Sequence, residues 1–453
     1  MDKLFFHEIL EVLGQQKTYE DFLVTGISTD TRTMRQGDLF IAINGENFKG
    51  AKFVPAAIEK GAKAVITDEP TQADIPLIIV SDTTQAYQKI AGYYRDKYDI
   101  PLIAITGSNG KTTTRNMVKT ILATKYNVYT TEKNYNNEIG LPYTLLRMDH
   151  TYDCAVIELG MNHMGEIDRL TRLAKPTISV ITNIGMAHIG FLGSQENIKK
   201  AKLEIVNGMA NGTLILNGDD PYLKDVTYDN LEVLFTGTNA NADFMLKDIV
   251  FNPGNTTFTV IHDGIEAQCS LPTIGKHNVY NAMEAIAVAC TMGFTLPEAC
   301  AALSSYQNVA LRNEVKDING VTIIKDYYNA SPDSMREALN ALGNIKTTEN
   351  KYALLGQMHE LGDYSQQAHK MVAGFCENNH LSHVFFIGDE YEAFQAGLST
   401  ISCHCYKADQ REQMKTDLQT FAKQLTPGDV ILVKGSRASA MEDFDEVLES
   451  TIA

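Results

Sequence analysis

Four short apolar runs alternate with segments of helical periodicity between residues 101 and 220, and this alternation restricts the possible fold more than any other feature. Strands that alternate with helices in this way predict a parallel sheet with crossover helices. We therefore expect an α/β domain in this part of the chain. The apolar runs are PLIAI (101–105), YDCAVIELG (152–160), TISVITNIG (177–185) and GTLILNGDD (212–220), and the helical segments include RNMVKTILATKY (115–126) and SQENIKKAKLEIVNGM (194–209).

The same alternation extends in both directions along the chain. Its 453 residues exceed the length at which one hydrophobic core stops growing. The alternation favours a small N-terminal α/β domain at 1–97 and a Rossmann-like C-terminal α/β domain at 312–453. Between them we expect a central parallel-sheet domain similar to P-loop ATPases at 98–311. Within it, residues 244–271 alternate with period two around NPGN and HDG, which predicts an antiparallel ribbon.

Charge and composition exclude several classes of partner. A formal net charge of −17 argues against a nucleic-acid-binding surface, since phosphate neutralisation requires a basic face. The amino-terminal MDKLFFHEILEVLGQQ has no basic segment followed by a long apolar one, and no run is long enough to span a membrane. Seven cysteines without C-x-x-C spacing indicate reduced thiols and no metal cluster. We therefore expect a cytoplasmic protein without a nucleic-acid or membrane partner.

The segment ITGSNGKTTT (105–114) predicts a phosphate-binding loop between a strand and a helix. Such a loop places backbone N–H groups and a helix N-terminus where phosphate oxygens bind. The general pattern G-x-x-x-x-G-K-[ST] requires a glycine where Ile105 stands, and an ordinary strand–turn–helix junction is the alternative. Lys111 would reach the β- and γ-phosphates, and the Thr112 hydroxyl would bind Mg²⁺. The residues assigned to the nucleotide here are Gly107, Ser108, Asn109, Gly110, Lys111, Thr112 and Thr113.

Two further polar residues follow neighbouring strands. Glu158 ends the run CAVIELG, and His188 follows TISVITNIG. Ligands of parallel α/β sheets bind at the carboxyl edge of the strands, where a carboxylate is a natural Mg²⁺ ligand. A single histidine in an apolar loop is more often structural, but the shared edge favours a functional role. Lys202 lies in ENIKKAKLEI beside two other lysines, and these residues alone indicate a solvated helix face.

The shortened loop TGSNGKTTT resembles the ATP loop of the Mur ligase superfamily, whose members build the peptide of bacterial cell-wall precursors. The ordered set of matching stretches is most similar to the branch that attaches D-alanyl-D-alanine to UDP-N-acetylmuramoyl-tripeptide. The resemblance implies a monomeric, ATP-dependent amide ligase that acts through an acyl phosphate and releases ADP and phosphate. The other matching stretches are KNYNNEIGLP (133–142), VIELGMNHMGEI (156–167), ITNIGMAHIGFLGSQENIKKAKLEI (181–205), DYYNASPDSM (326–335), LGQMHELGDYSQQAH (355–369) and VKGSRASAME (433–442).

The resemblance also implies two Mg²⁺ sites. Lys202 would be carbamylated by CO₂ and would hold the second Mg²⁺ beside Glu158 and His188, with Thr112 serving the first. Carbamylation requires a neutral amine, so the resemblance implies a lowered lysine pKa, which partial burial would supply. Lys111, Lys202, His188 and Glu158 are the residues to which it gives catalytic roles.

Further residues receive binding roles from the resemblance. Asn278 and Asn281, in HNVYNAMEA, would read the adenine edge, although helix capping is the alternative. Arg312 and Asp326 would contact the ribose or phosphates when the domains close. Lys434 and Arg437, in VKGSR, would lie near the phosphates of the substrate, and for these four charged residues surface positions are the alternative.

The N-terminal block contains two stretches that resemble a uridine-diphosphate pocket, GISTDTR (26–32) and GDLFIAINGENFKG (37–50). Ser28, Thr29 and Arg32 would serve the UDP phosphates. The family often has Asp-Gly-His where this chain has Lys49-Gly50-Ala51, which is a departure from its pattern. Asn136 and Asn137 would touch the substrate or the γ-phosphate, and a polar turn is the alternative there.

Two other functions stay open at this point. Another ligase of the superfamily, such as a folylpolyglutamate synthase or the diaminopimelate- or lysine-adding enzyme, would share the ATP chemistry but differ in its acceptor. The absence of a D-N-P-R stretch counts against the amino-acid-adding enzyme. A nucleotide-binding module or kinase without ligase activity would not need the second Mg²⁺ site. The identity of the third residue of the peptide is also open.

Overall fold

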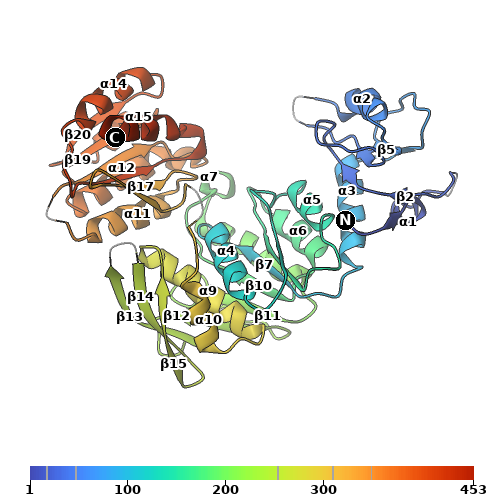
Figure 1. Ribbon diagram of the computed structural model, residues 1–453, viewed down its shortest axis with the longest axis horizontal. Coiled ribbons are helices and arrows are strands. Elements are labelled where there is room, and N and C mark those ends of the chain that lie inside the picture. Colours follow the sequence, from blue (N-terminus) through green and yellow to red (C-terminus); the bar gives the residue numbers. More distant parts are fainter. Residues whose placement is uncertain (17–18, 46–47, 253–254, 309–310, 348) are drawn as a thin grey trace.

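The computed structural model describes residues 1–16, 19–45, 48–252, 255–308, 311–347 and 349–453. It contains a large central sheet, a smaller sheet formed by residues that precede it in the chain, and another formed by residues that follow it, which confirms the expected α/β class. Figure 1 shows the N-terminal and C-terminal parts standing on opposite sides of the central part. Among the described residues, none of the helices combines the length and apolar character needed to cross a membrane.

The N-terminal part is built on a four-stranded parallel sheet. Its strands are β3 (Ile27–Ser28), β4 (Leu39–Ile41), β5 (Ala64–Thr67) and β6 (Leu77–Ile79), with α2 (Val54–Glu59) between β4 and β5. A short ribbon of β1 (Leu4–Phe5) and β2 (Leu23–Val24) accompanies α1 (Phe6–Val12).

Helix α3 (Thr83–Arg95) connects this part to the central one. The Asp82 side chain accepts a hydrogen bond from the Gln85 amide and caps the helix. At the other end, Arg95 Nε donates to the Ala174 carbonyl at 2.9 Å. Because α3 packs against central helices along its length, the two parts share one hydrophobic core.

The central part contains a nine-stranded sheet in the order β15-β14-β13-β12-β11-β10-β7-β9-β8. From β8 through β9, β7, β10, β11 and β12 to β13, each pair of neighbouring strands is parallel. Strands β13, β14 and β15 form the antiparallel ribbon that the sequence predicts. Pro253 and Gly254 of its NPGN turn lie outside the described residues. The bounds are β7 (Leu102–Thr106), β8 (Val128–Thr130), β9 (Cys154–Glu158), β10 (Ile178–Ile181), β11 (Thr213–Asn217), β12 (Glu232–Gly237), β13 (Phe244–Asn252), β14 (Asn255–His262) and β15 (Ile265–Leu271).

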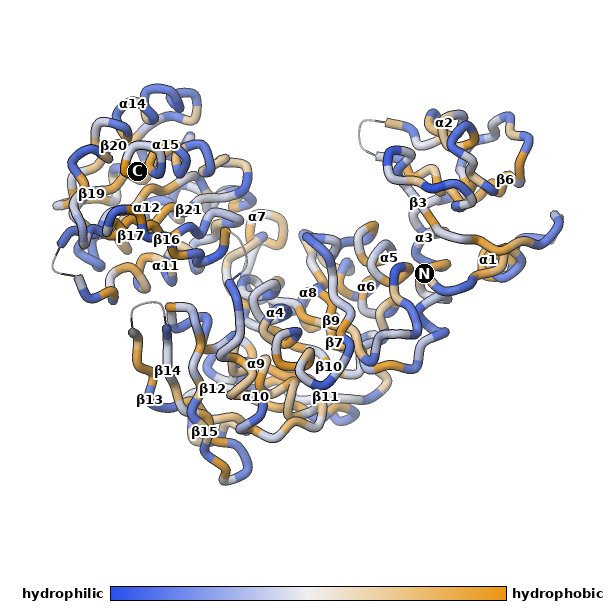
Figure 2. Tube along the Cα trace, in the orientation of Figure 1, coloured by the Kyte–Doolittle hydropathy of each residue, from blue (hydrophilic) through white to orange (hydrophobic). Residues whose placement is uncertain are grey.

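Helices cover both faces of this sheet because its strands are apolar on both sides. Ile103 and Ile105 of β7 pack against one set of helices, and Leu102 and Ala104 pack against the other, as the period of two requires. One set is α4 (Lys111–Leu122), α9 (Lys276–Thr291) and α10 (Leu296–Leu303), and the other is α5 (Gly140–Leu145), α6 (Glu166–Ala174) and α8 (Gln195–Leu203) with the 3₁₀ turn η2 (Glu204–Gly208). Figure 2 shows apolar residues gathered around α9 and α10, inside the central part.

The C-terminal part has a six-stranded sheet in the order β16-β17-β21-β18-β19-β20. Only the pair β16–β17 is antiparallel among the described pairings. The strands are β16 (Glu314–Ile318), β17 (Val321–Asp326), β18 (Lys351–Gly356), β19 (His383–Ile387), β20 (Ser402–Tyr406) and β21 (Val430–Lys434), and the helices are α11 (Pro332–Asn344), α12 (Ser365–Asn378), α13 (Tyr391–Gln395), α14 (Arg411–Ala422) and α15 (Glu442–Ile452).

Two details differ from the sequence-based expectations. The helix after the glycine loop begins at Lys111, before the expected helical segment 115–126, because Gly110 already has the left-handed conformation of a helix boundary. Cys269 of β15 and Cys300 of α10 form a disulfide, with their Cα atoms 4.8 Å apart. The expectation of reduced thiols is therefore wrong for this pair.

Candidate active site

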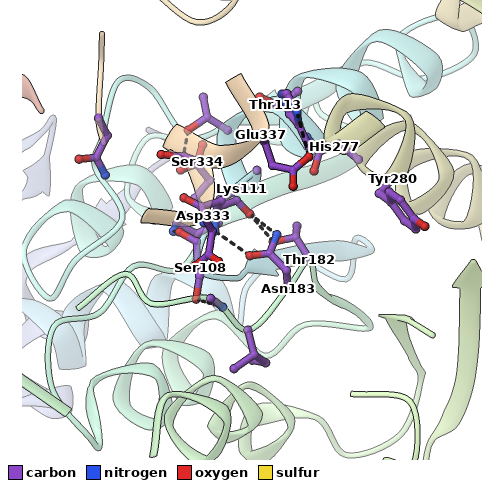
Figure 3. A pocket seen from close by; sticks show the side chains of 18 of the residues that line it. Ser108, Lys111, Thr113, Thr182, Asn183, His277, Tyr280, Asp333, Ser334 and Glu337 are labelled. Carbon is purple, nitrogen blue, oxygen red and sulfur yellow. Dashed lines mark hydrogen bonds and ion pairs between the residues drawn. The ribbon is translucent and has the colours of Figure 1, made fainter. Parts of the chain in front are cut away.

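A cavity of about 1130 Å³ lies between the carboxyl edge of the central sheet and the C-terminal part of the chain. Figure 3 shows side chains from both parts directed into it. Most of the residues predicted from the sequence meet here, although they come from segments far apart in the chain. Those that line the cavity are Ser108, Asn109, Gly110, Lys111, Thr112, Thr113, Asn136, Asn137, Glu158, His188, Asn278, Asn281, Arg312, Asp326 and Lys434.

The loop after β7 requires glycine at two positions. Gly107 has a φ of +148°, and a Cβ there would collide with the Thr182 hydroxyl oxygen. Gly110 has a φ of +88°, and a Cβ there would collide with the side-chain oxygen of Asn281. Since left-handed backbone and close approach both exclude a side chain, the two glycines fix the path of the loop around the start of α4.

The loop is held by the segment that follows β10, the next strand in the sheet. The Ser108 amide donates to the Asn183 carbonyl at 3.0 Å, and the Asn109 amide donates to the Asn183 side chain at 3.0 Å. The Gly185 amide donates to Ser108 Oγ at 2.8 Å. Figure 3 shows Ser108 and Asn183 on facing segments. These bonds preorganise the loop, which lowers the cost of binding an anion.

Lys111 points back over this loop from the first position of α4. Its Nζ donates to the Gly107 carbonyl at 2.7 Å. The pKa of Lys111 is lowered to about 8, mainly by burial; the charge of Glu158 opposes this effect, that of Arg312 adds to it, and that of Glu360 opposes it. A desolvated ammonium inside a loop of this shape attracts an anionic ligand strongly.

Glu158 lies at the end of β9 and is almost fully buried, with 2% of its surface exposed. Its Oε1 is 2.9 Å from Nη1 of Arg115, and its Oε2 accepts from the Thr112 hydroxyl at 3.3 Å. Asn136 Nδ2 lies 3.5 Å from the same Oε2. Arg115 was not among the predicted residues, although its position one turn after Thr112 places both on one helix face.

His188 starts the short helix α7 (Ile189–Leu192) in a left-handed conformation, with a φ of +64°. Its Nδ1 lies 2.6 Å from Oε2 of Glu360, in the segment after β18 of the C-terminal part. The contact with His188 is the main cause of a lowered pKa of the Glu360 carboxyl. Sequence reasoning did not single out Glu360, because nothing in the local pattern of LGQMHELGD indicates that it meets a residue 172 positions earlier.

Lys202 is buried in α8, with only 1% of its surface exposed, so the interpretation of a solvated helix face is wrong. Its ammonium makes no hydrogen bond or ion pair with any part of the chain that the structure describes. Burial lowers the pKa of Lys202 well below its usual range, and the charge of Lys111 adds to this effect. The spacing could have revealed the burial, since Lys202 lies four residues after Ile198 and next to Ala201, on the side of the helix that these two apolar residues bury.

The residues expected around the nucleotide are partly engaged with one another. Asn278 and Asn281 are buried, and Asn278 Nδ2 donates to the Ile274 carbonyl at 2.8 Å. Asp326 and Lys434 form an ion pair with Nζ 2.5 Å from Oδ2. The Arg312 guanidinium lies over the Tyr328 ring, 4.3 Å from its centroid, and its Nε is buried without a hydrogen-bond partner among the described residues.

Other predicted residues do not line the cavity: Gly107, Lys202, Ser28, Thr29, Arg32 and Arg437. The Arg32 side chain is 88% exposed and pairs with Asp30 at 2.7 Å, in the N-terminal part. Arg437 is 60% exposed and pairs with Glu442 at 2.9 Å. Ser28 donates to the Asp30 carbonyl at 3.0 Å. Of the stretch 37–50, residues 46 and 47 lie outside the described residues.

The donor set at the sheet edge fits Mg²⁺. In the described ranges there is no group of three or more His, Cys, Asp and Glu side chains arranged to hold a metal. Mg²⁺ is usually bound by one or two carboxylates together with substrate phosphates and water, so a complete protein cage is not required. The buried carboxylate of Glu158, which Arg115 pairs with at Oε1, and the neighbouring Thr112 hydroxyl are oxygen donors of this type.

The C-terminal part touches the phosphate-loop region directly through the start of α11. Ser331 Oγ donates to Asn109 Oδ1 at 3.0 Å, and Asp333 Oδ2 accepts from the Met186 amide at 2.6 Å. The cavity is therefore completed by two parts of the chain that are in contact.

Comparisons with known proteins agree along the whole chain. A family model described as Mur ligase middle domain matches residues 105–289, one described as Mur ligase, glutamate ligase domain matches 311–437, and one described as Mur ligase family, catalytic domain matches 23–100. A UDP-N-acetylmuramoyl-tripeptide–D-alanyl-D-alanine ligase of Bacillus subtilis is 38% identical over 441 residues, 96% of this chain and 95% of that protein.

Two solved structures are similar to the full architecture. A MurF structure from Acinetobacter baumannii superposes with a TM-score of 0.91 at 28% identity, covering 99% of each chain. The MurF ligase from Thermotoga maritima, solved in complex with ADP, superposes with a TM-score of 0.85 at 28% identity, covering 94% of this chain and 97% of that one.

Proposed function

The chain belongs to the Mur ligase family of ATP-dependent amide ligases, and we propose that it joins D-alanyl-D-alanine to UDP-N-acetylmuramoyl-tripeptide in peptidoglycan precursor synthesis. The observation that carries this proposal is the cavity in which the phosphate loop, Glu158 and His188 meet the C-terminal part. Relatives that match nearly the whole chain are named for this reaction, which favours this function over those of the other branches of the family.

The chemistry requires activation, because a carboxylate oxygen is a poor leaving group. The tripeptide carboxylate attacks the γ-phosphorus of ATP, the bond to the β-phosphate oxygen breaks, and ADP leaves. The free amine of D-alanyl-D-alanine then attacks the acyl phosphate, loses a proton and displaces inorganic phosphate. Both steps place negative charge near the loop, so Lys111 stabilises them by its fixed positive charge.

Thr112, Glu158, His188 and a modified Lys202 would hold Mg²⁺ in this site. Mg²⁺ would supply charge neutralisation for the phosphate oxygens during phosphoryl transfer. Arg115 holds the Glu158 carboxylate at 2.9 Å and thereby keeps it at the sheet edge. The His188 ring is fixed from the C-terminal side by Glu360.

Lys202 carries a carbamate in this proposal. Its neutral Nζ bonds to the carbon of CO₂ and releases a proton, which converts the neutral amine into an anionic carbamate with oxygen atoms that can bind a metal. Burial at 1% exposure and the absence of an ion pair in the described residues support this, because both favour the neutral amine. A protonated lysine at this position would be an uncompensated buried charge.

The remaining predicted residues bind the rest of the substrates. Residues 98–311 and 312–453 hold ATP between them, with Asn278, Asn281, Arg312 and Asp326 near the nucleotide. Residues 1–97 receive the UDP end through Ser28, Thr29 and Arg32. In this proposal Asn136 and Asn137 touch the substrate or the γ-phosphate, and Lys434 and Arg437 lie near the phosphates of the substrate. The N-terminal part stands across the central part from the C-terminal one, which suits a long substrate that spans both (Figure 1).

The enzyme acts as a monomer in the cytoplasm in this proposal. The cavity is formed by one chain, so no second copy is needed to complete it. ATP and nucleotide-linked precursors are both available in the cytoplasm.

The test is a phosphate-release assay with mass analysis of the product. The purified enzyme is incubated with ATP, Mg²⁺, D-alanyl-D-alanine and UDP-N-acetylmuramoyl-tripeptide, in separate reactions with lysine or diaminopimelate at position three. We expect phosphate release only with both substrates, and a product heavier by one dipeptide less water. Free D-alanine should not replace the dipeptide. Turnover with a folate and glutamate would contradict the proposal, and ATP hydrolysis without product would favour the module without ligase activity.

A further inference from the structure

The segment between β18 and α12, residues 357–364, reaches from the C-terminal part onto α7 of the central part. Figure 1 shows α7 extending toward the C-terminal part. The Gly190 amide donates to the Glu360 carbonyl at 3.1 Å, and the Tyr364 hydroxyl donates to the Gly193 carbonyl at 3.0 Å. The C-terminal part therefore contacts the backbone of the central part near both ends of α7, through the Glu360 carbonyl at Gly190 and through the Tyr364 side chain at Gly193.

This contact leaves no room for a side chain between the two segments. A Cβ on Gly190 would lie 2.6 Å from the Gly362 amide nitrogen and 2.7 Å from the Glu360 carbonyl oxygen. Distances below about 3 Å require the backbone to move, so only glycine permits this approach. The fit indicates a specific contact between the two parts.

The two side chains at the centre of this contact both have left-handed backbones. His188 has a φ of +64°, and Glu360 has a φ of +63°. A non-glycine residue in this conformation costs roughly 1 kcal/mol or more and persists where the surroundings over-determine it, frequently at functional sites. The paired conformations bring His188 Nδ1 to 2.6 Å from Glu360 Oε2.

An ionised carboxylate only accepts hydrogen bonds, so a neutral His188 in this contact carries its proton on Nδ1. The other ring nitrogen, Nε2, then has the lone pair that a metal ligand needs. In metal sites a ligating histidine commonly donates its second ring N–H to a carboxylate, which fixes the ring orientation and raises its basicity. The ion pair of His188 Nδ1 with Glu360 Oε2, 2.6 Å apart, brings a carboxylate to the ring nitrogen that would donate in such a pair.

We propose that Glu360 is a positioning residue: it fixes the tautomer and the orientation of His188 from the C-terminal part and so links the seating of that part to metal binding at the sheet edge. This inference rests on the proposed function, in which His188 is a ligand of Mg²⁺. It adds a residue from the third part of the chain to a site otherwise built by the second. Metal affinity is then highest when segment 357–364 is seated on α7.

The test uses the full-length enzyme with Mn²⁺ in place of Mg²⁺ and a non-hydrolysable ATP analogue. Free Mn²⁺ is measured by electron paramagnetic resonance for the wild type, Glu360→Gln and Glu360→Ala. We expect the Mn²⁺ dissociation constant to rise about 10-fold for the glutamine variant and up to about 100-fold for the alanine variant. Asp363→Asn is the matched control, since Asp363 is an exposed acid of the same segment. We expect its Mn²⁺ dissociation constant to stay within about 2-fold of the wild-type value, because it does not contact a metal ligand.

A second readout separates positioning from simple adhesion between the parts. In protein labelled with ¹⁵N-histidine, the wild-type His188 should show the Nδ1–H tautomer, and Glu360→Ala should shift it toward Nε2–H. Small-angle scattering of the same samples reports whether the parts separate. An alanine variant that separates the parts while Mn²⁺ affinity and the tautomer stay unchanged would make Glu360 a structural clasp and overturn the proposal.

His188→Ala distinguishes this inference from the function on which it rests. If His188→Ala weakens Mn²⁺ binding and both Glu360 variants bind like the wild type, only the role of Glu360 is refuted. If His188→Ala also binds Mn²⁺ like the wild type, the ligand role of His188 fails, and the role of Glu360 fails with it. The ligase reaction itself is tested separately by product formation.

Discussion

Glu284 is buried beneath the phosphate loop and is expected to make the stability of the central part depend on pH. It lies in α9 with no exposed surface, and its Oε2 is 3.1 Å from the Thr114 hydroxyl of α4. Its Oε1 is buried without a hydrogen-bond partner in the described residues. Burial raises the pKa of Glu284 from 4.5 to about 8, and the nearby charge of Asp220 adds to the rise.

The direction of the effect follows from proton binding in the two states. Between pH 4.5 and about 8 the unfolded chain has released the Glu284 proton and the folded chain has not. Raising the pH in this window therefore favours unfolding, and the loss of stability is complete above pH 8. At about 1.4 kcal/mol per pH unit, the change from pH 5.5 to pH 8 is about 3 kcal/mol.

Glu284→Gln removes this dependence because glutamine has nearly the same volume, retains an oxygen that accepts from Thr114, and does not ionise. We expect the variant to gain about 3 kcal/mol over the wild type between pH 5.5 and pH 8. Hydrogen exchange measured by mass spectrometry on peptides of α4 and α9 gives the local opening free energy at each pH, after correction for intrinsic exchange rates.

Glu298→Gln is the control, because the pKa of Glu298 is shifted in the opposite direction to that of Glu284. The side-chain hydrogen bond from Lys125 lowers the pKa of Glu298 to about 2, so its contribution is present at neutral pH and is lost only in acid, between about 4.5 and 2. Its removal should not change the slope between pH 5.5 and pH 8. If the opening free energy changed equally with pH in the wild type and in Glu284→Gln, the reasoning would be refuted, because the Glu284 carboxyl would then be charged in the folded protein.

Three further variants test residues in and around the cavity. Lys111→Ala should reduce turnover by about 100-fold or more, since it removes the charge aimed at the phosphates, and near-normal phosphate release would show that the loop does not bind ATP. Lys202→Ala should abolish turnover while ATP binding survives, and acetate but not chloride should restore part of the rate; full activity without rescue would contradict the carbamate. Arg115→Met should destabilise the fold by about 3–5 kcal/mol in urea denaturation, because it leaves the buried Glu158 charge unpaired, and a loss below about 1 kcal/mol would mean that water replaces the arginine.

Much of the fold was predictable because its information is local. Apolar runs such as PLIAI and TISVITNIG became β7 and β10 at nearly the expected positions. Strands β1, β2, β3, β8, β12, β16 and β20 were not among the predicted ones. Two of them, β16 and β20, are edge strands in which buried residues are few, so the apolar signal on which the prediction depends is weak there. The bounds of the three domains stay predictions.

The candidate site was predictable where a particular chemical role requires a particular residue type at a particular position. The loop from Gly107 to Thr112 was found because its glycines and lysine form a pattern, and Glu158 was found because it ends an apolar strand. Lys202 was misread from its neighbours, since a lysine beside other lysines looks solvated in a sequence. The folded structure shows that its side chain is buried with Ile198 and Ala201 on one side of α8.

The sequence by itself determined the alternation of strands and helices, the phosphate loop and the sheet edge on which Glu158 and His188 lie, because each depends on residues within one or two neighbouring elements. The tertiary structure alone decided that Arg115 pairs with Glu158, that Glu284 is enclosed beneath the loop, and that Glu360 reaches His188 from the C-terminal part. The physical reason is that burial and pairing depend on which surfaces meet after the chain has folded, and the seating of one part on another leaves no periodic pattern in either segment.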